Sequence, residues 1–129
     1  MTSPARSGAA IARDGTFDLL CVVAFVVIGR RSHDEASGLE GLLRVVWPFA
    51  AGLLGATVVA AGARFGPWRA AVVTWIGTVG VGMALRIGVQ GRPFKVGFVI
   101  VTTLFLAVTM LGWRALAWAV WPRVRRRTR

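Results

Sequence analysis

The chain has 129 residues, of which 56% are hydrophobic and 16% are charged, and its mean hydropathy is +0.66. Its formal net charge is +11, from 16 Lys and Arg against 5 Asp and Glu. Soluble domains usually contain about 45–50% apolar and about 25% charged residues. This composition therefore excludes an ordinary soluble enzyme and a disordered tail, and it indicates a single small membrane domain with basic loops.

The cysteine and histidine content excludes several kinds of active site. One cysteine rules out a disulfide framework, a paired-thiol redox motif and a thiolate zinc site. One histidine rules out bis-histidine haem ligation and a metalloprotease motif. Since the sequence contains no nucleophile–base pair either, we expect a protein that is not an enzyme, with no catalytic residues, metal or cofactor.

The first apolar segment, 16–29, is short for a membrane span. It becomes long enough as a helix over 16–33 if the side chains of Arg30 and Arg31 extend outward to the headgroups. A cleaved signal peptide is one alternative, because Arg6 and Arg13 precede the segment. A segment that lies only at the membrane interface is the other. No small-x-small cleavage motif follows it, so a retained span is favoured.

Three longer segments, 42–63, 70–90 and 94–121, are each sufficient to cross a bilayer. The first two reach roughly 32 Å at about 1.5 Å per residue, close to a hydrocarbon core of about 30 Å. The last is too long, so its end, with Trp113, Trp118 and Trp121, is expected at the interface. Short connections around Gly66-Pro67 and 91–93 make consecutive helices antiparallel neighbours. The predicted fold is an all-α integral membrane four-helix bundle.

The basic residues predict an orientation. The four spans form a domain over 16–121, between an N-terminal tail (1–15) and a basic C-terminal tail (122–129). Residues 1–10 and 122–129 are expected to be disordered or bound to the surface. Nine of the 16 basic residues lie on the side that holds both termini and the 64–69 loop. Six lie on the other side, two of them within helix ends rather than loops. The bias places both termini in the cytoplasm.

Charged residues within or beside the spans are the candidate functional residues, because a charge near mid-span costs about 2.5–3.5 kcal/mol on insertion scales. They are Asp18, Arg44, Arg86 and Arg114. Asp18, the only acid in a predicted span, suits the coupling group of a proton-driven carrier. Because Asp18 and Arg114 fall at the same end of a four-span bundle, we predict an ion pair between them; the alternative is that each extends separately to the headgroups.

Two helical stripes of small and polar residues repeat every four positions. They are Thr74, Thr78, Gly82 and Arg86 in one span, and Arg44, Pro48, Gly52 and Ala56 in the other. Close helix packing is favoured over a solute path, since threonines can bond to their own backbone. Pro48 deprives the carbonyl of Arg44 of its helical donor. A helix that begins near Trp47 is favoured over a kinked helix with a free acceptor.

A basic cluster is expected at the outer ends of the helices. Besides Arg44 and Arg86 it comprises Arg30, Arg31, His33, Arg92 and Lys95. It suits an anion-attracting vestibule or a headgroup site, although arginines that only anchor helix ends are favoured. The C-terminal arginines are expected to contact the anionic inner leaflet rather than nucleic acid.

Several short motifs resemble a known family. They are Asp18 early in the first helix, 29–33 (GRRSH), 47–49 (WPF), Arg86 before Arg92-Pro93, and Arg114 in the fourth helix. Together they are similar to a small prokaryotic membrane family, domain of unknown function 3054, over about 17–118. The resemblance implies four transmembrane helices, and it carries no activity or catalytic residue. The Ala- and Arg-rich composition, with Lys95 the only lysine, is typical of a high-GC bacterium, so a bacterial cytoplasmic membrane is expected.

Two functions are consistent with these features. The first is transport or permeation of a small solute or ion by a homo-oligomer, because four short helices barely enclose a path. The alternative is a structural or accessory membrane protein that binds lipid or a larger membrane partner. In both cases the expected partners are the bilayer and its anionic headgroups.

Overall fold

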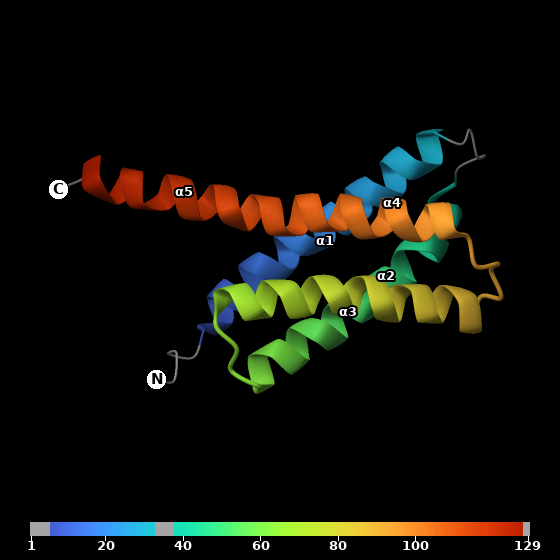
Figure 1. The fold of residues 1–129 in the computed structure, drawn as a ribbon, viewed down its shortest axis with the longest axis horizontal. Coiled ribbons are helices and arrows are strands. Elements are labelled where there is room, and N and C mark those ends of the chain that lie inside the picture. The colour runs from blue at the N-terminus through green and yellow to red at the C-terminus, as the bar shows by residue number, and fades with distance from the viewer. Residues whose placement is uncertain (1–5, 33–37, 128–129) are drawn as a thin grey trace.

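The computed structural model describes residues 6–32 and 38–127, with side chains for 6–30 and 38–120. This part of the chain is helical without strands: α1 (Gly8–Ser32), α2 (Leu39–Gly62), α3 (Pro67–Gly88), α4 (Val96–Leu106), the π-helical η1 (Ala107–Leu111) and α5 (Gly112–Arg127). The last three run on continuously as one α4–α5 rod (Figure 1). The predicted all-α, four-helix class is confirmed.

Three of these helices are long and apolar enough to cross a membrane. They are Leu39–Gly62, Pro67–Gly88 and Val96–Val120. α1 is not among them, and its apolar part is flanked or interrupted by Arg13, Asp14, Asp18 and Arg30. That α1 spans the membrane therefore stays a prediction.

Both ends of the helical domain extend further than the sequence predicted. α1 begins at Gly8 rather than near residue 16, because Ser7 caps it: the Oγ of Ser7 accepts a hydrogen bond from the amide of Ala10 at 3.1 Å. α5 continues to Arg127, through a segment rich in the strong helix formers Ala and Arg. Much of the two predicted tails is thus helix, and α5 continues past the ends of α1 and α3 (Figure 1).

The favoured interpretation of Pro48 was wrong. α2 begins at Leu39, so Pro48 lies inside the helix and is buried. The carbonyl of Arg44, which lacks a helical donor because proline has no N–H, accepts a hydrogen bond from the side-chain amide of Gln90. This bond from the end of α3 replaces the missing helical one and helps the helix to tolerate proline.

The small-residue stripes bring α2 and α3 into close contact, as the packing interpretation predicted. A Cβ on Gly77 would come within 2.5 Å of the Cβ of Ala56, and one on Gly82 within 2.4 Å of the Phe49 ring. Thr74 and Thr78 are buried, and their hydroxyls donate to the carbonyls of residues 70 and 74 at 2.6 Å. The stripe therefore serves helix packing, and its two hydroxyls bond within their own helix.

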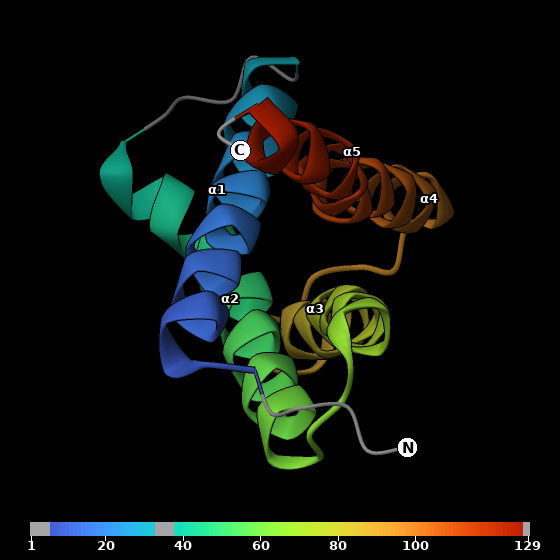
Figure 2. The same cartoon turned by 90° about the vertical axis from the view of Figure 1, so that its left-hand side faces the viewer.

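Aromatic and aliphatic side chains fill the space between α1, α2, α3 and the α4–α5 rod. Phe25 packs against three other rings, with centroids 5.5–6.1 Å away, on Phe49, Phe98 and Phe105. Leu106 and Met110 on the α4–α5 rod are fully buried beside them. Figure 2 looks almost along α3 and the rod, with α1 and α2 running across them. The core thus lies between two crossing pairs of helices: α1 with α2, and α3 with the α4–α5 rod.

Candidate functional site

The predicted ion pair between Asp18 and Arg114 is present in the structure. The guanidinium donates two parallel hydrogen bonds to the carboxylate, from Nη1 to Oδ1 and from Nη2 to Oδ2, each at 2.7 Å. Asp18 is 1% exposed and Arg114 is 8% exposed. This bidentate geometry is the strongest that the two groups can adopt, and it joins α1 to the beginning of α5.

Aromatic side chains enclose the pair. The indole N–H of Trp113 donates to Oδ1 of Asp18 at 3.0 Å, so this carboxylate accepts three hydrogen bonds. The same Trp113 ring lies 4.7 Å from the guanidinium carbon of Arg114 and stacks on Phe17 at 5.0 Å. Each charge thus has an opposite charge and a polarisable ring beside it, in surroundings from which water is largely excluded.

The π-helical segment η1 positions Arg114. Nη1 of Arg114 also donates to the backbone carbonyl of Met110, at 2.9 Å, and Met110 lies within η1. Single π turns inside α-helices are frequent at functional sites. In the described part of the chain no Cα of α5 comes within 8 Å of α1, α2 or α3. Side chains rather than close backbone packing therefore connect this end of the rod to the bundle.

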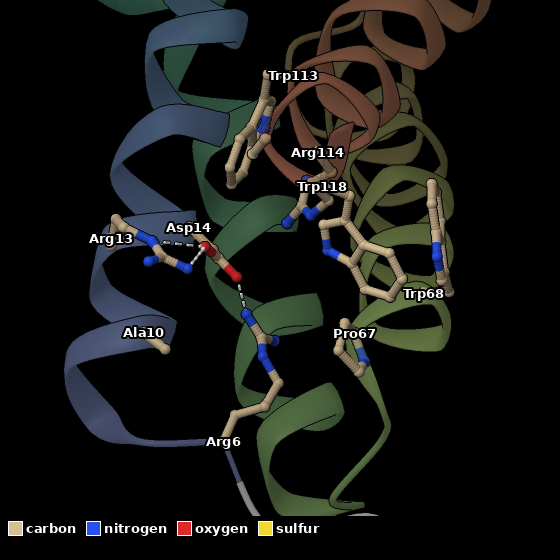
Figure 3. A pocket seen from close by; sticks show the side chains of 10 residues that line it. Arg6, Ala10, Arg13, Asp14, Pro67, Trp68, Trp113, Arg114 and Trp118 are labelled. Carbon is tan, nitrogen blue, oxygen red and sulfur yellow. Dashed lines mark hydrogen bonds and ion pairs between the residues drawn. The ribbon is translucent and has the colours of Figure 1, made fainter. Parts of the chain in front are cut away.

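A partly enclosed cleft of about 210 Å³ lies beside the ion pair. Its walls come from the beginning of α1, the beginning of α3 and the first turns of α5 (Figure 3). Arg6, Arg13, Asp14 and Arg114 give it charge, and Trp68 and Trp118, whose rings meet edge to face at 5.3 Å, cover one side. We call this the helix-end cleft.

Asp14 is shared between two arginines in this cleft. It forms an ion pair with Arg6, and its Oδ1 accepts hydrogen bonds from Nε and Nη2 of Arg13 at 3.3 and 3.2 Å (Figure 3). Burial lowers the pKa of the Arg6 guanidinium, and the positive charges of Arg114 and Arg13 lower it further, against a smaller opposing effect of Asp18. Three guanidinium groups thus meet two carboxylates here, an excess of one positive charge.

The described members of the outer basic cluster make separate contacts rather than one shared site. Arg44 pairs with exposed Glu40 at 2.9 Å, and the guanidinium carbon of Arg86 lies 4.5 Å from the centre of the Phe98 ring. The guanidinium of Arg30 packs on Gly41. Arg92 and Lys95 are exposed. These contacts resemble anchored helix ends more than a shared vestibule.

The side chains of two further members of the cluster, Arg31 and His33, are not described by the structure. His33 falls outside the described residues, and for Arg31 only the backbone, at the end of α1, is described.

Sequence reasoning did not find the helix-end cleft, because its residues 6–14 were assigned to a tail. A signal was present: Ser7 is a strong N-cap residue, and Asp14 lies four positions before Asp18, on the same helical face. Trp68 carried no signal beyond its place in the short connection just before a predicted span.

The fold and this site define a small helical protein with membrane-spanning character and a buried charge pair at one end. Residues 16–117 match the model of a protein family of unknown function, DUF3054, and the chain belongs to that family. The resemblance inferred from the short motifs is thereby confirmed. Neither a curated protein nor a solved structure matches the chain.

Proposed function

We propose that the protein is a multi-pass component of a bacterial cytoplasmic membrane that transports or conducts a small solute or ion as a homo-oligomer. The observation that carries this proposal is the buried Asp18–Arg114 pair beside the helix-end cleft. In this proposal both termini face the cytoplasm, the protein catalyses no reaction, and its basic C-terminal segment contacts lipid rather than nucleic acid.

A buried ion pair supports a functional role because it is a costly way to hold helices together. Removing two charges from water costs several kcal/mol per ion, and apolar side chains of similar volume are often as stabilising or more so. An ionisable group within a membrane helix is therefore, by default, a candidate member of an ion or proton pathway. Asp18 also lies close to the cleft, since its partner Arg114 forms part of the cleft wall.

The tight packing inside one chain supports a solute path that lies between copies of the chain in the oligomer. α2 and α3 touch at Gly52, Gly77 and Gly82, and Phe49 is fully buried among the helices. No continuous row of unsatisfied polar groups crosses the described interior, because its threonine hydroxyls bond to their own helices. An oligomer is the arrangement that lets charged groups at the helix ends line a passage.

The test is flux through liposomes that contain the purified protein. We expect flux of protons or of a small ion above that of protein-free liposomes, and a loss of at least tenfold in Asp18→Asn. Glu40→Gln, which removes an exposed carboxylate (86% side-chain exposure), is the matched control and should leave the flux unchanged. The double variant Asp18→Asn with Arg114→Gln removes the pair without leaving a lone charge, so its loss of flux in folded protein would exclude misfolding as the cause.

A structural or accessory role is the second candidate, favoured by the full set of hydrogen bonds around Asp18. It predicts no flux for any variant, together with co-purification of lipid or of a larger membrane partner. Absence of flux for protons and for small cations and anions, in liposomes with verified insertion, would overturn the transport proposal and leave this one.

A further inference from the structure

We propose that the helix-end cleft is a binding site for a phosphate group, presented by an acidic phospholipid at the membrane surface. The inference does not depend on transport, because it rests on the charge, room and depth of the cleft.

The charge of the cleft favours an anion. Arg6 and Arg13 share the single carboxylate of Asp14, while Arg114 is held by Asp18. Each guanidinium has five N–H donors, so one shared carboxylate leaves donors of Arg6 and Arg13 for a further acceptor. A phosphate oxygen is the acceptor that arginine binds in the same forked geometry as a carboxylate.

The room in the cleft also suits such a group. Its volume is about 210 Å³, whereas about 10–15 Å³ by the same kind of measure holds one water molecule. A phosphate with several waters therefore fits without movement of the helices. Pro67, at the first turn of α3, forms part of the wall, and the amide end of that helix adds partial positive charge to the arginines.

The depth of the cleft identifies the source of the phosphate. α3 is one of the helices long and apolar enough to span a membrane, and the cleft lies at its first residues. In the proposed arrangement this end of α3 lies at the membrane surface. Trp68, Trp113 and Trp118 line the same cleft, and tryptophan is enriched at the headgroup level of membranes. A lipid phosphate lies at this level, with its acyl chains free to run along the exposed apolar helix faces.

The test measures binding to the full-length protein in nanodiscs or mild detergent at low ionic strength. The probes are phosphatidylglycerol, inorganic phosphate, and phosphatidylcholine as the control that carries a phosphate but no net charge. Retained lipid is counted by native mass spectrometry, and affinity is followed by the thermal shift. We expect phosphatidylglycerol to bind, and Arg6→Gln and Arg13→Gln each to weaken it roughly tenfold, the factor for one hydrogen bond to a charged group. Arg64→Gln, which removes an exposed charge at the same end of the bundle outside the cleft wall, should change little.

A gain of binding makes the test independent of misfolding. Asp14→Asn removes the competing carboxylate and should tighten phosphatidylglycerol binding, whereas Glu40→Gln, with the same change of charge elsewhere, should not. Binding of inorganic phosphate with the same dependence on Arg6 and Arg13, but no preference for phosphatidylglycerol, would keep the phosphate site and overturn the lipid source. Equal losses in Arg6→Gln and Arg64→Gln, or no binding of either probe, would overturn the site itself.

Discussion

The side-chain amide of Gln90 donates a hydrogen bond to the backbone carbonyl of Arg44 across a separation of 46 positions in the chain, with Nε2 2.6 Å from the oxygen. That carbonyl is the one that Pro48 leaves without a donor in α2. The two features compensate each other, since the bond forms where the helix ladder is interrupted. It also fixes the end of α3 beside the first turns of α2.

Gln90→Ala is therefore expected to lower the free energy of unfolding by about 0.5–1.5 kcal/mol, the usual net contribution of one hydrogen bond. In a Pro48→Ala background the new amide of residue 48 takes the carbonyl, so the same Gln90→Ala change should cost close to nothing. Thermal or denaturant unfolding in detergent of the four variants measures the coupling. An equal cost of Gln90→Ala in both backgrounds would show that the two residues do not compensate.

The Asp18–Arg114 pair gives a larger coupling. Asp18→Asn and Arg114→Gln should each lower stability by about 3–5 kcal/mol, because either change leaves a buried charge without its partner. The double variant should lose less than the sum of the two. Unfolding measured as a double-mutant cycle checks this, and strictly additive losses would mean that the pair contributes no interaction energy.

Glycines on α3 offer a matched comparison of packing. Gly77→Ala should destabilise the protein by about 1–3 kcal/mol, because its Cβ would lie 2.5 Å from the Cβ of Ala56 and the helices must separate. Gly80→Ala, on the same helix with nothing within 4 Å of its Cβ, should stabilise it by about 0.5–1 kcal/mol through helix propensity. The same sign for both variants in an unfolding experiment would contradict the role assigned to the α2–α3 contact.

Hydropathy and charge predicted much of this architecture, because both patterns can be recognised within the sequence of a single helix, without knowledge of tertiary contacts. Long apolar segments indicated the helices. The cost of burying Asp18 and Arg114 unpaired, at the same end of the bundle, indicated their ion pair. The four-residue repeat of Thr74, Thr78 and Gly82 likewise indicated packing, since small residues on one helical face allow a close approach.

The features that the sequence did not reveal depend on tertiary contacts. In the sequence Gln90 is only the polar last residue of a predicted span, and it is the fold that places it beside Arg44. Asp14 lies within α1 and Arg6 lies just before it, so both reach the site only because the helix begins as early as Gly8. A single N-cap residue, Ser7, was a weaker signal than the low hydropathy of its surroundings, so the helix start was predicted too late.

The orientation of the helices in the membrane is the remaining prediction. If the chain has four spans, nine of the 16 basic residues lie on the side of the 64–69 loop and both termini, and that side is expected to face the cytoplasm. With four spans, a cytoplasm-active reporter fused after Arg129 should be active, and one inserted within residues 32–41 should be inactive. The second fusion tests α1 directly, because that helix is not among the three that are long and apolar enough to cross. A periplasmic C-terminal reporter would contradict the four-span arrangement and indicate three spans, with α1 lying along the membrane surface.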